Sequence, residues 1–144
     1  VHEVMDDIIA RCVAIKRDVV EADEFDKGER MLLNFGHTLG HSIEQYYHYT
    51  GISHGRAVAK GMEIITDLAE KRGMCRKGLT ADLCGCLKKY ELTRDIEPTP
   101  AQLGSACMND KKRDGSSIHV IICSDIGKSS AVKMSVADFN DFLA

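Results

Sequence analysis

Apolar residues near the start of the chain recur at the spacing of a helix. Val4, Ile8 and Cys12 lie four positions apart, which aligns them on one helix face and does not match the alternation of a strand. The pattern predicts a first helix over residues 3–20. Polar residues at positions 21–28 then interrupt it and mark a connection.

Helical spacing continues through the middle of the chain, where capping residues indicate the bounds. Ser53 can cap a helix through its hydroxyl group, and Gly73 is placed to end that helix. Residues 99–102 (Thr-Pro-Ala-Gln) form a capping box with proline at the first helical position. Together these signals predict further helices over residues 29–47, 53–71, 80–90 and 99–109.

The final part of the chain changes to a pattern typical of strands. Residues 118–123 are rich in β-branched side chains, residues 125–127 contain a turn glycine, and residues 131–134 form a second extended piece. One small hairpin fits this pattern, and Ser135 can cap a last helix to residue 143. Because no series of alternating strands and helices is present, we expect a mainly α, multi-helix fold without a Rossmann-type half.

Length and charge limit the classes of function. At 144 residues the chain fits a single domain over residues 1–144 that buries its own core. Its 19 basic and 22 acidic residues give a formal net charge of -3, so no overall field favours nucleic acid or an anionic membrane. No stretch approaches the roughly 18 apolar residues of a membrane span. We therefore expect neither a nucleic-acid partner nor a membrane.

The six cysteines lack the spacing of a disulfide framework. Cys84 and Cys86 are the closest pair, but they do not have C-x-x-C spacing, and no second pair completes a four-ligand zinc site. We expect reduced, packed thiols and a cytoplasmic protein.

One face of the second predicted helix carries an unusual polar stripe. A solvated face is the ordinary interpretation of such a stripe, yet this one contains two imidazoles, a guanidinium group and an amide, and no lysine. Gly36 and Gly40 flank the histidines, although each glycine within a helix costs about 1 kcal/mol of stability relative to alanine. This cost indicates that a ligand, the backbone or a crossing helix approaches closely at these positions. At about 100° per residue on a continuous helix, the stripe comprises Arg30, Asn34, His37, His41 and Glu44.

The histidines of this stripe have the spacing of metal ligands. His37 and His41 lie four positions apart, where two imidazoles can converge on one ion, although caps, core histidines and chance produce the same spacing. His54 follows a loop, and an antiparallel turn would return it toward His37. On a continuous helix Glu44 lies roughly 10 Å from His37 along the axis. The carboxylate that would complete a catalytic zinc site is therefore expected from outside this chain.

The residues around these histidines resemble the signature of the 3-dehydroquinate synthase family. Residues 30–44 (RMLLNFGHTLGHSIE) and 54–62 (HGRAVAKGM) carry the resemblance. It extends upstream through Lys16 and residues 19–24, and downstream through residues 110–127. It thus covers essentially the whole chain, and it implies the C-terminal helical domain of these enzymes, a fold related to metal-dependent alcohol dehydrogenases.

The resemblance implies roles for the matching residues. His37 and His54 match two zinc-ligating histidines, and His41 matches a catalytic histidine that faces the substrate near its phosphate and helps with proton transfer. Residues that match substrate-binding positions, for the carboxylate, hydroxyl groups and phosphate, are Lys16 (also a catalytic candidate), Arg30, Asn34, and Lys111 or Lys112.

The family converts 3-deoxy-D-arabino-heptulosonate 7-phosphate into 3-dehydroquinate and phosphate, in the shikimate pathway of aromatic amino acid biosynthesis. The resemblance implies a lyase that uses NAD and zinc or another divalent metal such as cobalt, and that forms a homodimer at full length. The NAD-binding domain and the glutamate that completes the zinc site are not among these residues. We therefore interpret the chain as a fragment that is inactive alone, binds no NAD and binds zinc weakly.

One position departs from the family pattern, and three other functions compete with this interpretation. Arg56 stands where the family has glutamate after His-Gly, which places a cation near a helix N-terminus, where the helix dipole disfavours it. The alternatives are another sugar-phosphate cyclase, a metal-dependent alcohol dehydrogenase, and a non-catalytic helical module that docks a partner through the stripe.

Overall fold

The computed structural model describes residues 4–23, 28–111 and 117–144, and the side chains of all of these except residues 108–111. The chain divides into two compact units, Val1–Asn34 and Phe35–Ala144. In the described part of the chain, no helix is long and apolar enough to cross a membrane.

The first unit consists of helix α1 (Met5–Ala22) and the short 3-10 helix η2 (Glu29–Asn34). The predicted first helix is thus confirmed, with bounds shifted by two residues. Asp23 follows α1, and its Oδ2 atom accepts hydrogen bonds from the backbone N–H groups of Gly28 (2.7 Å) and Arg30 (3.1 Å). This one carboxylate anchors the start of η2.

The helix predicted over residues 29–47 is wrong as a continuous element. η2 ends at Asn34, a turn follows, and α2 begins at His37 and ends at Tyr46. Gly36 in this turn has a φ of 77°, a left-handed conformation that favours glycine, and a Cβ atom there would lie 2.6 Å from the Val58 carbonyl oxygen. Its carbonyl oxygen then accepts the Gly40 N–H at 2.8 Å. The predicted stripe is therefore split, with Arg30 and Asn34 on a different helix from the histidines.

The second unit contains the remaining elements, which follow the predicted order. Its described residues form a mainly α fold with one antiparallel hairpin near the C-terminus, so the predicted fold class is confirmed. The elements are α2 (His37–Tyr46), α3 (His54–Lys71), α4 (Leu79–Lys89), α5 (Pro100–Lys111), β1 (Ile118–Asp125), β2 (Lys128–Met134) and α6 (Val136–Leu143).

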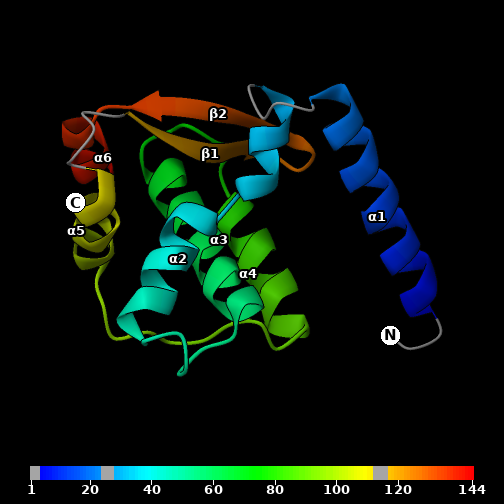
Figure 1. Cartoon of the computed structure of the whole chain (residues 1–144), viewed down its shortest axis with the longest axis horizontal. Coiled ribbons are helices and arrows are strands. Elements are labelled where there is room, and N and C mark those ends of the chain that lie inside the picture. The colour runs from blue at the N-terminus through cyan, green and yellow to red at the C-terminus, as the bar shows by residue number, and fades with distance from the viewer. Residues whose placement is uncertain (1–3, 24–27, 112–116) are drawn as a thin grey trace. The chain divides into compact units, whose positions relative to one another are not determined.

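The core of this unit lies between the helices and the hairpin. Helix α3 packs against α2, α4 and β1, and α5 packs against α2 and α6. Figure 1 shows the hairpin across one end of α3, with α5 and α6 together on one side of the unit. The largest fully buried side chains come from α2, α3, α5, β1 and α6, and they are Phe139, Leu39, Ile43, Ile65, Leu103, Ile118 and Val120.

Two of the three predicted helix caps are present. In the α5 capping box, Thr99 Oγ1 accepts the Gln102 N–H at 3.3 Å, and Gln102 Oε1 accepts the Thr99 N–H at 2.8 Å. At α6, Ser135 Oγ accepts the Asp138 N–H at 3.1 Å. Ser53 occupies the N-cap position of α3, but its hydroxyl makes no capping hydrogen bond, so this prediction was wrong in its chemistry.

Helices α2 and α3 approach so closely that glycine is required where they meet. A Cβ atom built on Gly61 of α3 would overlap the carbonyl oxygen of Gly36. A Cβ atom on Gly40 would lie 3.1 Å from the Cα atom of Val58. Of the three explanations left open for Gly36 and Gly40, the structure therefore supports a helix crossing with direct backbone contact.

We expect Gly61→Ala to lower the free energy of unfolding by about 1–3 kcal/mol, because the methyl group meets backbone in a close-packed crossing. Gly85 supplies a matched control, since it is exposed within α4 and a Cβ atom there meets nothing within 4 Å. Gly85→Ala should raise the free energy of unfolding by up to about 1 kcal/mol. Urea unfolding measures both changes, and equal stabilities of the two variants would contradict the crossing.

Glu70 of α3 caps the next helix. Its Oε1 atom accepts the Gly78 N–H at 2.6 Å, and its Oε2 atom accepts the Thr80 N–H at 2.9 Å, at the start of α4. These backbone hydrogen bonds lower the pKa of Glu70 from its ordinary value of 4.5 to about 2. A carboxylate at a helix N-terminus is also favoured by the helix dipole. The sequence pattern does not predict this cap, because the glutamate belongs to the preceding helix.

The depressed pKa predicts a pH-dependent stability. Ionised Glu70 stabilises the fold fully when the pH is above the unfolded-state pKa of 4.5. This contribution to stability is lost as the pH falls toward the folded-state pKa of about 2. We expect the Glu70→Gln protein to be less stable than the parent at neutral pH. The difference in stability should shrink as the pH falls from 4.5 to about 2. Asp67→Asn, which removes an exposed carboxylate paired with Lys71, is the control. Thermal unfolding from about pH 2 to 7 tests this, and a Glu70→Gln difference independent of pH would refute it.

Candidate metal centre

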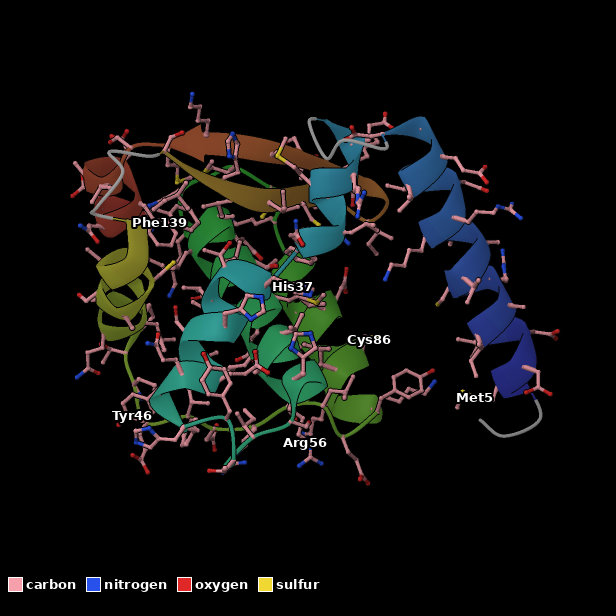
Figure 2. All side chains as sticks on the ribbon, viewed as in Figure 1. Met5, His37, Tyr46, Arg56, Cys86 and Phe139 are labelled. Atoms are coloured by element: carbon pink, nitrogen blue, oxygen red, sulfur yellow. The ribbon has the colours of Figure 1, made fainter. Side chains whose placement is uncertain are left out.

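Three imidazole rings gather where α2 meets the start of α3. His37 and His41 are one turn apart on α2, and His54 is the first residue of α3. The ring centroids of His37 and His54 lie 5.3 Å apart, those of His37 and His41 5.7 Å, and those of His41 and His54 5.9 Å. Figure 2 shows the His37 ring projecting from the first turn of α2. Residues 37 and 54, distant in sequence, thus come to one place.

Local backbone structure explains this meeting. Gly36 starts α2 directly before His37, and a tight connection returns the chain to α3. In that connection His48 and Tyr49 have φ values of 52° and 59°, and the Tyr49 N–H donates to the Glu44 carbonyl oxygen at 2.8 Å. The antiparallel turn expected from the sequence is therefore present, and it returns His54 to the His37 ring.

Each of the three rings is held through its Nδ1 atom. His37 Nδ1 lies 3.2 Å from the Phe35 carbonyl oxygen. His41 Nδ1 and His54 Nδ1 each lie 3.1 Å from an oxygen of the Glu44 carboxylate. Carbonyl and carboxylate oxygens only accept hydrogen bonds, so a neutral imidazole at each position must carry its proton on Nδ1. We infer from these partners that the Nε2 lone pair of all three rings is left for a metal ion or a proton.

Glu44 has contacts that its distance from His37 does not predict. The structure places its carboxylate between His41 and His54, and whether a carboxylate from outside the chain completes the site stays a prediction. Among the described residues, His41, Glu44 and His54 form a group in which one ligand atom of each lies within 4.8 Å of the others. The three-residue spacing from His41 to Glu44 was the available signal, because side chains three apart meet on a helix.

The donor atoms at this place fit a divalent transition metal. Imidazole nitrogen and carboxylate oxygen are the ligands that zinc uses in catalytic sites, and imidazole also suits cobalt. His41 and His54 are largely open, with side chains 63% and 56% exposed, while the Glu44 side chain is only 13% exposed. A ligand can therefore reach the rings from solvent, and the carboxylate lies beneath them.

The other predicted site residues lie in the first unit, or at and beyond the end of α5. Lys16 lies on α1, and Arg30 and Asn34 lie on η2, all in the first unit, so their roles stay predictions. Lys111 ends α5 but its side chain is outside the described residues, as is the whole of Lys112.

Arg56 lies in the first turn of α3, where the family pattern has glutamate. Its residue is exposed, and Figure 2 shows its side chain directed away from His37. The unfavourable cation near the helix N-terminus is therefore solvated, which reduces its electrostatic penalty.

Comparison with known proteins gives a consistent family. The model of the 3-dehydroquinate synthase C-terminal region matches residues 1–113. The chain is 44% identical over 134 residues to a 3-dehydroquinate synthase of Clostridium perfringens (92% of this chain, 38% of the relative). It is 40% identical over 144 residues to that of Clostridium kluyveri (99% and 40%). The chain thus spans about two fifths of the length of these relatives.

Solved structures show the same fold at lower identity. A crystal structure of 2-deoxy-scyllo-inosose synthase, complexed with carbaglucose-6-phosphate, NAD+ and Co2+, superposes with a TM-score of 0.75 at 22% identity. The superposed region covers 94% of this chain and 39% of the synthase chain. At this identity the likeness supports the architecture alone.

We expect nitrogen NMR of the 144-residue chain to find His37, His41 and His54 in the Nδ1–H tautomer, because each Nδ1 atom faces an acceptor. His119 is the internal control, as it is exposed on β1 and should show the mixture of tautomers of a solvated imidazole. Long-range ¹H–¹⁵N correlations at mildly alkaline pH distinguish the forms. A dominant Nε2–H form at any of the three rings would contradict the described hydrogen bonds.

Proposed function

This chain belongs to the 3-dehydroquinate synthase family, whose C-terminal domain model it matches, and from that premise we propose that it supplies the metal- and substrate-binding half of such an enzyme. The proposed reaction of the whole gene product converts 3-deoxy-D-arabino-heptulosonate 7-phosphate into 3-dehydroquinate and phosphate. The two units of the chain function together as one domain in this proposal.

The observation that carries the proposal is the meeting of the His37 and His54 rings, whose centroids are 5.3 Å apart. With Nδ1 of each ring engaged by an acceptor, the two Nε2 atoms can bind one cation from adjacent helices. A bound zinc or cobalt ion would acidify a coordinated hydroxyl group of the substrate and polarise the ketone made from it. The Co2+ in the related synthase structure supports a divalent metal in this fold.

His41 is the proton carrier in this proposal. Its ring lies 5.7 Å from His37 and 5.9 Å from His54, so it is adjacent to the proposed metal position. Imidazole exchanges protons near neutral pH, and with Nδ1 facing Glu44 the exchange takes place at Nε2. The open side chain of His41 lets a sugar phosphate contact this atom.

The substrate's anionic groups require cations and hydrogen-bond donors. We assign Lys16, Arg30 and Asn34 to the substrate's carboxylate, hydroxyl groups and phosphate, and Lys111 or Lys112 to the phosphate. Positively charged side chains hold a phosphate ester and stabilise the charge that develops as phosphate leaves. Lys16 also contributes to catalysis in this assignment.

The rest of the gene product completes the site in this proposal. This chain spans 38% and 40% of the two bacterial relatives compared above, and NAD accompanies the metal in the related synthase structure. We assign NAD binding, the transient oxidation it supports and the third metal ligand to an N-terminal domain. A cytoplasmic homodimer is part of the same proposal.

The proposal predicts that the complete gene product releases phosphate from the heptulosonate phosphate and retains about one divalent metal ion per chain. His37→Ala and His54→Ala should each lose the metal and reduce turnover by more than about a hundredfold, because each substitution removes one of the proposed ligating nitrogens. His119→Ala, an exposed residue of β1, should change neither.

Metal analysis and a phosphate-release assay measure these outcomes. Full turnover in His37→Ala would reject the metal assignment. Phosphate release from a different sugar phosphate, with none from the heptulosonate, would assign the protein to another sugar-phosphate cyclase instead.

A further inference from the structure

We propose that Glu44 is a positioning residue that holds the proposed metal ligand His54 and the proposed proton carrier His41 through one carboxylate. This inference rests on the proposed function, and it assigns a role to a residue that the sequence alone places too far from His37 to share its metal ion.

The geometry gives each carboxylate oxygen a different ring. Glu44 Oε1 lies 3.1 Å from His54 Nδ1, and Glu44 Oε2 lies 3.1 Å from His41 Nδ1. One side chain thereby joins α2 to the first residue of α3. Both hydrogen bonds can form at once only if both rings present Nδ1–H, because an ionised carboxylate has no proton to donate.

The difference in burial between Glu44 and the two histidines determines which side of the site each occupies. The Glu44 side chain is 13% exposed, against 63% for His41 and 56% for His54. A partly buried carboxylate with two charge-assisted hydrogen bonds is held firmly, whereas an exposed imidazole alone would rotate about its χ2 bond. The carboxylate therefore aligns the two open rings and keeps both Nε2 atoms on the accessible side.

The consequence for chemistry is that one residue orients two different functions. Ligating histidines in metal sites ordinarily donate their second N–H to a carboxylate or a backbone carbonyl, and loss of such a partner weakens metal affinity about 10–100-fold. His37 obtains this support from the Phe35 carbonyl oxygen, which no side-chain substitution removes. His54 obtains it from Glu44, and the same side chain supports His41.

A competing role for Glu44 is direct ligation, since its carboxylate belongs to the three-residue group with His41 and His54. Ligation of that kind would use the Nδ1 atoms that face Glu44. His37, whose Nδ1 atom faces Phe35, would then lie outside the ligand set. The two roles therefore predict opposite effects of His37→Ala on metal binding.

The test compares Glu44→Gln with Glu63→Gln in the complete gene product. Glu63 is a suitable control because its side chain is 25% exposed and it pairs with Lys60 on its own helix. A glutamine amide offers one acceptor oxygen and one NH₂ donor, so it cannot accept from both rings. We expect Glu44→Gln to weaken Co2+ affinity about 10–100-fold, and to lower kcat with little change in KM. Glu63→Gln should leave these values at the parent level.

A second measurement detects positioning directly. In nitrogen NMR of the 144-residue chain, Glu44→Gln should convert His41 or His54 to the Nε2–H tautomer while His37 keeps Nδ1–H. The parent spectrum alone also tests the inference if the variant does not fold, because an Nε2–H tautomer at His41 or His54 in the parent would overturn it. The inference would also be overturned if a folded Glu44→Gln protein bound Co2+ as tightly as the parent. Loss of Co2+ binding in Glu44→Gln together with retention in His37→Ala would replace positioning by direct ligation.

These outcomes separate the inference from the proposed function. A protein that binds Co2+ through His37 and His54 but releases no phosphate from the heptulosonate fails the proposed reaction, while the Co2+ and tautomer measurements still decide the role of Glu44. If the parent releases phosphate and the Glu44→Gln protein keeps full Co2+ affinity, only the positioning role of Glu44 is rejected.

Discussion

The crossing of α2 and α3 is the constraint on which the candidate site depends. The Gly36 carbonyl oxygen sits against Gly61 with no room for a Cβ atom between them, so the two helix backbones are in direct contact. His37 begins one helix and His54 the other. Packing at this density transmits any separation of the helices directly to the rings. The same glycine that breaks the predicted long helix therefore sets the distance between the imidazoles.

In the candidate site, the hydrogen-bond acceptors lie on the inner side and the exposed imidazole rings of His41 and His54 on the outer side. The Phe35 carbonyl oxygen and the Glu44 carboxylate engage the Nδ1 atoms, and the Nε2 atoms are left for chemistry. This division explains why a mostly covered glutamate lies beneath two open histidines. Within the run of residues 30–44, Gly36 turns the backbone, Gly40 packs on α3 and Glu44 contacts two rings.

Much of this architecture could be predicted from the sequence because local signals carry it. Apolar spacing and capping residues together predicted the six α-helices of the described residues, with the second extended wrongly back to residue 29. The capping box at Thr99 and the cap at Ser135 formed as expected. Periodicity could not reveal the break at Gly36, because a 3-10 turn followed by a helix preserves nearly the same apolar spacing. The Glu44–His54 contact and the Glu70 cap depend on which helices become neighbours, and no window of the sequence contains that information. The Glu44–His41 contact lies within one helix, so its three-residue spacing was a local signal. The metal-ligand interpretation of His37 and His54 came from the family resemblance and stays a prediction, while the structure supplies the proximity it requires.

In the proposed site, His37 and His54 bind one cation through their Nε2 atoms. Anomalous diffraction at the cobalt edge, from crystals of the complete gene product grown with Co2+, tests it most directly. We expect a single cobalt peak about 2.0–2.2 Å from both Nε2 atoms, with Glu44 outside the coordination sphere. A peak bonded to the Nδ1 atoms of His41 and His54 together with Glu44, or no peak near these rings, would contradict it.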